Sequence, residues 1–532
     1  MCKNITPLAI IILPIIISYI FLMNSTVDEM ANSGLLYLSN ISKAHTICHT
    51  ASKYVRKVLY VKIKGTPENT GAAIVNNLDS IYTKASSICG NIDIRLMLKP
   101  TEPVHSVKTS QPIDVILYDS DLAMDIDKLK QSVTTLNTDF KIQKIDCEDS
   151  NEKVIGEPIK RFEYVALGGT FDRLHNGHKI LLSQAAARAT KHVTVGVADV
   201  NMIKSKKLWE LIQPVEVRIQ EVKNFLNDIN PDVEYDVFPL QDLYGPTKDG
   251  PKYELLVVSE ETLPGAVKIN AKRKENGLKP MDVHVIGLAQ DSHPQRTDEE
   301  EVKVSSSNQR MRLLGTMLRP PVPNPNIPDW PYVIGLAGGI ASGKSNITEK
   351  LKAKGAAIIN CDVIAHELYK PGLPLNSTIA ENFDNVVSED GEIDRRRLAQ
   401  IVFNDKDQLE KLNSLVWPAV LEETQRRIRA FGEQGYKVVV MEAAVMVKAQ
   451  WYKYCHQLWS VIIPRDEAIK RLQNRNGMTQ EEAAQRVDSL PSNQEQVAPA
   501  NVVFSPYWSY EYTQGQIDRA WEQLQEYLRT RK

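Results

Sequence analysis

Short apolar runs rich in β-branched residues alternate with helical stretches over most of the chain, and this alternation constrains the fold more than any other feature. One set of five runs occupies residues 164–169, 192–199, 233–240, 254–261 and 282–289. A second set occupies residues 332–339, 356–362, 436–445, 458–464 and 500–506. Strands that alternate with helices predict a parallel sheet covered by helices. We therefore expect an α/β protein with two doubly wound parallel-sheet domains.

A proline-dense segment separates the two sets of runs. Residues 319–331 hold Pro320, Pro321, Pro323, Pro325, Pro328 and Pro331, a density that excludes a helix or a central strand, so we predict a stiff linker. Before the first set, short apolar runs among polar stretches predict a smaller mixed α/β region. The expected division is a leader over residues 1–57, the small domain over 58–158, the sheet domains over 159–318 and 332–532, and the linker over 319–331.

Composition excludes several classes of protein. The 532 residues include 64 Lys and Arg against 66 Asp and Glu, which gives a net charge of −2. A non-specific nucleic-acid-binding protein needs a basic excess, so we expect no nucleic-acid partner. The six cysteines are neither spaced as CxxC nor placed beside paired histidines, so the sequence predicts neither a zinc site nor a disulfide framework.

The N-terminal residues leave several interpretations open. Residues 8–23 are uncharged and almost entirely apolar, yet they are slightly short for a spanning helix and include Pro14. They are consistent with a membrane anchor. Alternatively, Met30 is the working start, and the basic, acid-free residues 31–67 are typical of mitochondrial targeting. A third interpretation gives the first thirty residues no role. We expect a mitochondrial location (outer membrane or matrix), a cytoplasmic one, or both. Residues 58–158 carry no motif and are interpreted as a structural or regulatory module.

The second sheet domain opens with a phosphate-binding loop. Its residues fit GxxxxGK[ST] between a predicted strand and a predicted helix, and they are Gly338, Gly339, Ile340, Ala341, Ser342, Gly343, Lys344 and Ser345. Glycines let backbone N–H groups face a phosphate, and the helix N-terminus adds partial positive charge. Lys344 is predicted to reach the β- and γ-phosphates of ATP, and Ser345 to bind Mg²⁺.

Two further features of this domain suit phosphoryl transfer. Asp362 ends the next predicted strand, where a carboxylate accepts a proton from an attacking hydroxyl. The alternative interpretation makes Asp362 a helix N-cap. Residues 465–489 predict an amphipathic helical pair with Arg471, Arg475 and Arg486. Arginines on a mobile lid clamp phosphate, whereas the alternative is a solvated helix face.

These motifs resemble the dephospho-CoA kinase family. GGIASGKS, CDVIAHEL, GEIDRRRL, MEAAVMVKAQW and the arginine segment occur in the family's order over residues 332–532. The resemblance implies transfer of the γ-phosphate of ATP to the ribose 3′-hydroxyl of dephospho-CoA, with Asp362 as the base. The chain departs from the family at Trp417, where histidine is usual before Pro418, and at Ser505, where asparagine is expected.

The first sheet domain carries an HxGH motif. Its predicted first strand leads into Gly168, Gly169, Thr170 and Phe171, and His175 and His178 then stand one turn apart at the start of a predicted helix. Imidazoles at a helix N-terminus stabilise the charge that develops on an α-phosphate as pyrophosphate leaves. Gly177 is expected to let a phosphate approach the backbone. The alternative is a pair of capping histidines.

Two downstream clusters support this site. Lys206, with Lys204 and Lys207 beside it, follows the second predicted strand, where ligands approach such sheets. We predict that Lys206 holds phosphate, against the alternative of a solvated basic loop. Ser305, Ser306 and Ser307, followed by Arg310, precede a helix and are predicted to bind an anion, against the alternative of simple capping.

This domain resembles the eukaryotic phosphopantetheine adenylyltransferase family. GGTFDRLHNGHK, LIQPVEVR, DLYGPTKDGP, LVVSEETLPGAVKINAKR and SSSNQR occur in the family's order over residues 160–318. The resemblance implies a Rossmann-like nucleotidyltransferase that transfers AMP from ATP to 4′-phosphopantetheine. It also suggests, by position alone, that Arg273 contacts phosphate.

The order of the two domains resembles bifunctional coenzyme A synthases, with a nucleotidyltransferase half before a P-loop kinase half. Its implied partners are ATP, 4′-phosphopantetheine and dephospho-CoA, with Mg²⁺ as the cofactor. Two alternatives remain. One is a pyridine-nucleotide adenylyltransferase fused to a nucleoside or nucleotide kinase. The other is an interaction protein in which one half is inactive.

Overall fold

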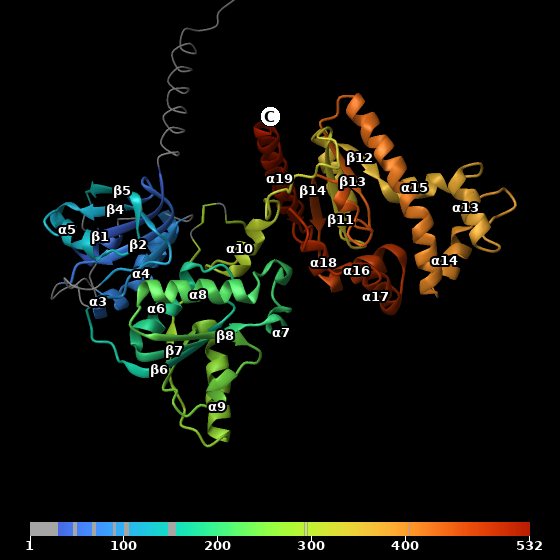
Figure 1. Ribbon diagram of the computed structural model, residues 1–532. Coiled ribbons are helices and arrows are strands. Elements are labelled where there is room, and N and C mark those ends of the chain that lie inside the picture. Colours follow the sequence, from blue (N-terminus) through green and yellow to red (C-terminus); the bar gives the residue numbers. More distant parts are fainter. Residues whose placement is uncertain are drawn as a thin grey trace, which may run out of the picture. The chain divides into compact units, whose positions relative to one another are not determined.

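The computed structural model describes residues 30–45, 50–65, 71–88, 92–99, 106–146, 156–291, 293–294, 296–403 and 405–531. These residues form two compact units, Met1–Gln309 and Arg310–Lys532. They contain three five-stranded sheets in which every strand pair is parallel, so the predicted α/β class is confirmed (Figure 1). The apolar run over residues 8–23 lies outside the described residues, and no described helix is both long and apolar enough to cross a membrane.

The first sheet belongs to the N-terminal region and has the strand order β3-β2-β1-β4-β5. Its elements are β1 (Ala31–Leu38), η1 (Ile41–His45), β2 (Val55–Ile63), α3 (Gly71–Asn76), α4 (Leu78–Ile88), β3 (Asp93–Leu96), β4 (Ile113–Asp119), η2 (Ser120–Leu122), α5 (Ile126–Ser132) and β5 (Leu136–Ile145). The predicted leader over residues 1–57 therefore needs correction. Strand β1, which begins at Ala31, is the central strand, and the basic, acid-free stretch supplies sheet residues.

The second sheet completes the first unit, with the order β10-β9-β6-β7-β8. Its elements are β6 (Phe162–Gly169), α6 (Asn176–Arg188), β7 (Ala189–Ala198), α7 (Val200–Ile203), η3 (Trp209–Leu211), α8 (Val215–Ile229), β8 (Glu234–Leu240), η4 (Gly245–Lys248), β9 (Leu255–Ser259), η5 (Glu260–Thr262), α9 (Leu263–Glu275), β10 (Asp282–Ile286) and the start of α10 (Ser306–Leu313). All five strands coincide with predicted runs. Numbered from its own first strand, each sheet of this unit has the order 3-2-1-4-5.

The third sheet forms the second unit, with the order β12-β13-β11-β14-β15. Its elements are β11 (Tyr332–Gly338), α11 (Lys344–Ala353), β12 (Ala357–Asn360), α12 (Cys361–Leu368), α13 (Pro374–Asn382), α14 (Arg395–Phe403), α15 (Lys406–Glu433), β13 (Val438–Glu442), η6 (Trp451–Tyr454), β14 (Gln457–Val461), α16 (Arg465–Asn476), α17 (Gln480–Asp488), α18 (Asn493–Val497), β15 (Val502–Phe504) and α19 (Tyr510–Thr530). The central strand β11 is buried along its whole length, as expected for a parallel sheet covered on both faces.

The proline-dense segment is tied to the second unit, which corrects the predicted boundaries. The guanidinium of Arg319 donates to the carbonyl of Ala500 at 2.8 Å, and Arg531 pairs with Asp329 at 2.7 Å. The division between the units falls at residues 309 and 310, inside α10. Residues 310–331 therefore belong to the kinase-side unit and are not a free connection between domains.

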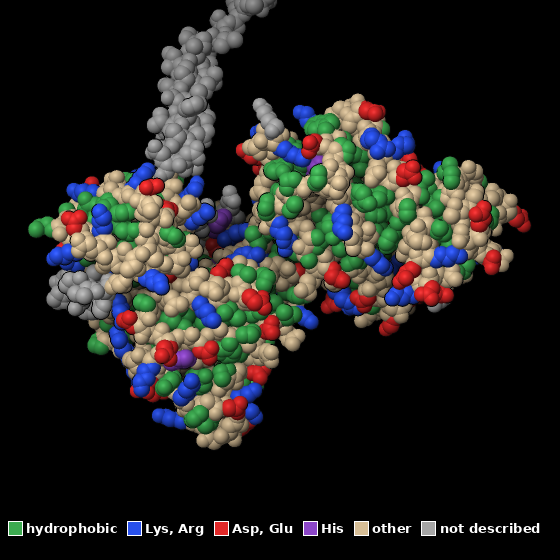
Figure 2. All heavy atoms as spheres, in the orientation of Figure 1, with side chains coloured by type: hydrophobic (Ala, Val, Ile, Leu, Met, Phe, Trp, Pro, Cys, Tyr) green, Lys and Arg blue, Asp and Glu red, His purple; other side chains and the backbone are tan. Residues whose placement is uncertain are grey.

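Charge is distributed evenly over the visible surface. On the face drawn in Figure 2, basic and acidic side chains are interspersed over both units, and no large area carries a single sign. This distribution fits the net charge of −2.

Candidate active sites

The glycine loop of the first site follows β6, the central strand of its sheet. Because the strand order reverses beside β6, the loop lies where doubly wound sheets bind ligands. Phe171 and Arg173 adopt left-handed backbone conformations, with φ of 50° and 49°. Between them, the buried carboxylate of Asp172 accepts the backbone N–H of Gln213 at 3.0 Å and the Arg173 guanidinium at 2.9 Å. The loop is thus a sharp turn held by a buried acid.

The structure brings the two histidines of the HxGH motif together. His175 is the N-cap of α6, and its Nδ1 accepts the backbone N–H of His178 at 3.4 Å. The two imidazole rings stack with centroids 3.8 Å apart. A Cβ at Gly177 would approach the His175 ring to 3.2 Å, a tight contact that would require the ring to shift. His175 caps the helix as the alternative interpretation stated, and the pair still presents imidazoles at a helix N-terminus.

The serine turn at the start of α10 lies beside the glycine loop. The hydroxyl of Ser306 donates to the carbonyl of Asp172 at 2.9 Å, while Ser305 accepts the N–H of Asn308 at 3.2 Å. Ser307 occupies the first turn of α10. Arg310 is fully buried and lies on α10, about one turn after Ser306.

Two polar residues that the sequence analysis missed hold this site in shape. Asn308 is fully buried and donates to the carboxylate of Asp291 at 2.9 Å and to the carbonyl of Glu301 at 2.8 Å. Arg218 is also buried, and it donates to the carbonyls of Thr170 at 2.7 Å and Ala198 at 2.9 Å. It thereby joins the glycine loop to the end of β7. Arg218 ends the LIQPVEVR motif of the sequence analysis, but its residue type and spacing gave no signal of burial.

The predicted basic contacts divide into two groups. Lys206 lines the cavity described below, whereas Lys204 and Lys207 are exposed and do not. Arg273 is fully buried, and its guanidinium donates to the backbone carbonyls of Thr247 and Gly250. It also donates to the carbonyls of Lys279 and Tyr253, so the structure shows Arg273 in hydrogen bonds to the backbone and does not support the suggested phosphate contact.

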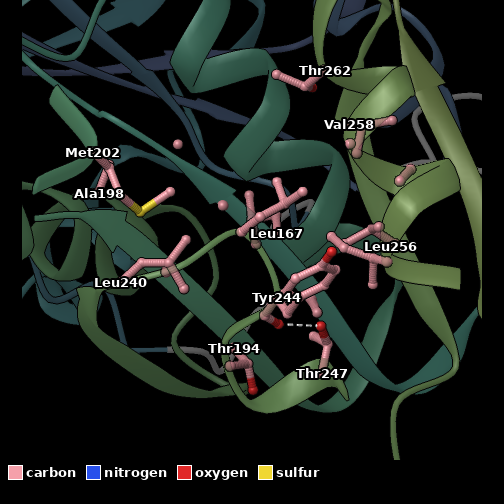
Figure 3. Close-up of a pocket in the computed structure, with 18 of the residues that line it drawn as sticks. Leu167, Thr194, Ala198, Met202, Leu240, Tyr244, Thr247, Leu256, Val258 and Thr262 are labelled. Carbon is pink, nitrogen blue, oxygen red and sulfur yellow. Dashed lines mark hydrogen bonds between the residues drawn. The ribbon is translucent and has the colours of Figure 1, made fainter. Parts of the chain in front are cut away.

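A cavity of about 330 Å³ opens beside the glycine loop (Figure 3). Strand β7 contributes Thr194, Gly196 and Ala198, which share one face because strand side chains alternate. The remaining lining is largely apolar and comes from β6, β8, β9, η4 and α9. The hydroxyl of Thr194 is buried and has no hydrogen-bond partner among the residues that the structure describes. An apolar cavity with a few polar groups is typical of a site for a small molecule.

The predicted phosphate-binding loop follows β11 and forms one continuous turn from Gly338 to Ser345. Gly343 has φ of 96° and caps α11, and a Cβ there would approach the Pro506 ring to 2.9 Å, so only glycine fits. The ammonium of Lys344 donates to the carbonyls of Gly338 at 2.8 Å and Gly339 at 3.1 Å. These two donors must turn from the carbonyls to phosphate when a nucleotide binds.

The acidic residues of this site differ in part from the prediction. Strand β12 ends at Asn360, which accepts the N–H of Val363 at 3.1 Å and is the true N-cap of α12. Asp362 therefore neither ends the strand nor caps the helix, and it stands exposed in the first helical turn. Glu442, which the sequence analysis did not single out, closes β13 and is buried. An acid at the end of the apolar run VVVM was the available signal.

Charges converge on Lys344. Burial lowers the pKa of Lys344, Glu442 and Asp362 oppose that effect, and Arg475 adds to it. Burial likewise raises the pKa of Glu442, against the effect of Lys344. The structure thus brings the predicted lysine, acid and arginine close together and adds Glu442.

The arginines of the helical pair have different surroundings. Arg471 donates to the carbonyl of Pro506 at 2.8 Å and pairs with Glu467 at 2.8 Å, so it buttresses the loop region. Arg475 is exposed on the last turn of α16, and Arg486 is exposed on α17. The helix-face alternative therefore fits Arg486 best.

Comparison with known proteins follows the same division of the chain. Residues 332–506 match the family model "Dephospho-CoA kinase", and residues 166–312 match "Cytidylyltransferase-like". A dephospho-CoA kinase from Carboxydothermus hydrogenoformans is 37% identical over 186 residues, which cover 35% of this chain and 90% of that protein. The chain belongs to the dephospho-CoA kinase family. Another dephospho-CoA kinase, from Syntrophus aciditrophicus, is 38% identical over 193 residues, covering 36% of this chain and 82% of that protein.

The part of the chain before the dephospho-CoA kinase domain matches a different enzyme. The phosphopantetheine adenylyltransferase of Saccharomyces cerevisiae is 37% identical over 147 residues, which are 27% of this chain and about half (48%) of that protein. The predicted order, a nucleotidyltransferase half before a dephospho-CoA kinase half, is confirmed. The resemblance to bifunctional coenzyme A synthases is confirmed with it, and a pyridine-nucleotide adenylyltransferase fused to another kinase is not favoured.

Proposed function

We propose that the chain catalyses two consecutive ATP-dependent steps that end in coenzyme A. The first joins AMP from ATP to 4′-phosphopantetheine, giving dephospho-CoA and pyrophosphate. The second transfers the γ-phosphate of another ATP to the ribose 3′-hydroxyl, giving coenzyme A and ADP. The observation that carries the proposal is the presence of two anion-binding loops in one chain, each following the central strand of its own sheet.

In the first step a phosphate oxygen of 4′-phosphopantetheine attacks the α-phosphorus of ATP, and the bond to the pyrophosphate oxygen breaks. No covalent enzyme intermediate is needed, because positioning and charge stabilisation suffice. His175 and His178 stand at the N-terminus of α6, where the helix dipole adds to their effect. The cavity is suited to the pantetheine arm, and Lys206 stands on its lining to pair with phosphate.

In the second step the ribose 3′-hydroxyl attacks the γ-phosphorus, and the bond to ADP breaks. Asp362 accepts the hydroxyl proton, since it stands exposed beside Lys344, whose pKa it influences. Lys344 and the loop N–H groups hold the β- and γ-phosphates. Arg475 supplies a second cation for the transferring group.

The second site suits Mg²⁺, although no group of three or more metal-ligating His, Cys, Asp or Glu occurs among the described residues. Mg²⁺ usually keeps several waters and takes only one or two protein groups beside substrate phosphates. Ser345, in the first turn of α11, and the buried carboxylate of Glu442 fit that role. When bound with ATP, Mg²⁺ neutralises phosphate charge. Removing it with EDTA is expected to stop coenzyme A formation.

One assay tests both steps. The full chain is incubated with ATP, Mg²⁺ and 4′-phosphopantetheine, and dephospho-CoA and coenzyme A are separated chromatographically. Lys344→Ala is expected to accumulate dephospho-CoA, and His178→Ala is expected to make neither product yet still phosphorylate added dephospho-CoA. If either substitution stops both steps, the two-site proposal is wrong.

The apolar run over residues 8–23 supports a separate proposal about location. We propose that it attaches the chain to a membrane, with a mitochondrial location alongside or in place of a cytoplasmic one. Fractionation of cells followed by blotting tests this. A pool found entirely in the soluble cytoplasmic fraction contradicts it.

A further inference from the structure

Helix α6, which begins inside the HxGH motif, is buried without a break. All nine residues from Lys179 to Ala187 are buried. A helix that covers only one sheet keeps a solvated face, so unbroken burial means that α6 is covered on all sides. Strands β6 and β9 contact it from its own domain, and α3 and α4 of the N-terminal region contact it as well (Figure 1).

The apolar contacts between the N-terminal region and α6 form one continuous core. A single hydrophobic cluster includes Leu78 and Tyr82 of α4 together with Leu181, Leu182 and Ala186 of α6. The two sheets of the first unit therefore share a core. The cover over α6 is part of the fold and not a loose domain contact.

Buried charges reinforce this contact at the start of the helix. Lys179, which directly follows His178, is 3% exposed and pairs with Asp93 of β3, with Nζ and Oδ1 2.6 Å apart. Asp93 also pairs with Arg95 at 2.7 Å, and Arg95 in turn reaches Asp228 of α8. Burial alone would raise the pKa of Asp93, but Lys179 and Arg95 outweigh it and hold that pKa below its ordinary value. Asp93 is therefore an ionised link between two sheets.

Hydrogen bonds extend the contact along the helix. Asn176, between the two histidines, donates from its side-chain amide to the backbone carbonyl of Tyr82 at 3.0 Å. Two turns later, Gln184 donates to the carbonyl of Val75 at 3.2 Å. The N-terminal region thus holds the first turn of α6, where the motif lies, and its middle.

The N-terminal sheet also repeats the strand order of the sheet that it supports. Both have the order 3-2-1-4-5 when numbered from their own first strand. Strand β6, however, ends in Gly168 and Gly169, whereas the equivalent strand β1 ends in Tyr37 and Leu38. The N-terminal region keeps the architecture without the glycine loop, which favours a supporting role over a second nucleotide site.

We propose that the N-terminal region is a positioning domain for adenylyl transfer, in which Asp93 and the Tyr82 carbonyl fix the first turn of α6 and so the two histidines. The inference rests on the function proposed for the first site. Asp93 is a positioning residue, since it acts through Lys179 and the helix. A shift of about 1 Å in a catalytic group costs on the order of 100-fold in rate.

The test compares three variants of the full chain. Asp93→Asn removes the ion-pair partner of Lys179. The double variant Asp93→Asn/Lys179→Met removes both charges, so no unpaired lysine is left buried and part of the lost stability returns. Asp125→Asn is the control, because it breaks the Lys64–Asp125 pair of the same N-terminal region, which does not involve α6. Melting temperature, kcat and KM for both steps are measured at a temperature where all variants are folded.

For the first two variants, kcat of adenylyl transfer is expected to fall roughly 10- to 100-fold, with KM for 4′-phosphopantetheine nearly unchanged. Phosphorylation of added dephospho-CoA is an internal control and should not change in any variant. A wild-type kcat in either Asp93 variant overturns the proposal, even if the melting temperature falls. If the unaltered chain makes no dephospho-CoA, the proposed function itself fails, which is a distinguishable result.

Discussion

The unpartnered hydroxyl of Thr194 is the most specific polar group in the cavity beside the glycine loop. It is buried among apolar side chains on β7, where an unsatisfied hydroxyl carries a desolvation cost. A ligand group that bonds to it removes that cost. The pantetheine arm carries amides and a hydroxyl that could bond to Thr194, so we expect this position to recognise the acceptor.

Replacing Thr194 by valine tests this recognition. Thr194→Val keeps the side-chain volume and removes one hydrogen bond, which is typically worth about 0.5–1.5 kcal/mol. We expect KM for 4′-phosphopantetheine to rise about 2- to 10-fold, with KM for ATP unchanged, in steady-state assays. Thr190→Val is the control, because Thr190 lies on the same strand but is exposed and bonds to the Phe162 carbonyl. An unchanged acceptor KM in Thr194→Val would show that the hydroxyl does not contact the substrate.

At the scale of elements, a buried histidine joins two strands of the third sheet. The Nδ1 of His456, just before β14, accepts the N–H of Val333 in β11 at 2.9 Å, and its ring stacks on Tyr332. Burial lowers the pKa of His456 from 6.5 to about 4. The folded state therefore keeps this histidine neutral where the unfolded chain already binds a proton.

This difference predicts a pH dependence of stability. Between about pH 6.5 and 4, His456 binds a proton in the unfolded chain but stays neutral in the folded protein. The free energy of unfolding therefore falls as pH falls, by at most about 1.4 kcal/mol per pH unit. His456→Gln removes this contribution, so its free energy of unfolding should fall less between pH 7 and 5 than that of the unaltered chain. Urea unfolding followed by tryptophan fluorescence measures it, since every tryptophan except Trp209 lies in the second unit. An equal fall in the free energy of unfolding of both proteins would contradict the lowered pKa assigned to His456.

The strands show which parts of the fold can be predicted from the sequence. Runs rich in β-branched residues predicted every strand of the second and third sheets. The inner strands are continuously apolar because both of their faces are covered, and the partly exposed edge strands β8 and β10 still carry valine or isoleucine. Strand β5 was missed because it lies at the sheet edge with mostly exposed, polar residues. Strand β1 was missed because its basic, acid-free surroundings were interpreted as a leader.

The site residues likewise divide into those that the sequence predicted and those that it did not. The glycines and histidines were found because they stand at fixed local spacings in motifs between a predicted strand and a predicted helix. Arg218, Asn308 and Glu442 were missed because their roles depend on tertiary contacts that sequence spacing does not encode.

At the scale of the whole molecule, two sites lie on one chain in separate units. Tethering raises the effective concentration of an intermediate at the second site but is not required for the chemistry. Lys344→Ala supplies only dephospho-CoA, and His178→Ala only consumes it. A mixture of the two is therefore expected to form coenzyme A after a longer lag than the unaltered chain at equal site concentration.

A time course of product formation measures that lag. If the mixture forms no coenzyme A while each variant keeps its single step, the intermediate does not leave the chain that made it. Equal lags would mean that the tether gives no kinetic advantage.

The unbroken burial of α6 has a consequence for sequence variation. On most helices the solvent-exposed positions accept many different residues, but every residue from Lys179 to Ala187 is buried. Related sequences should therefore vary least along this helix, and changes there should occur together with changes in α3, α4 or β3. We therefore expect the N-terminal region and the HxGH helix of this enzyme to have been inherited together.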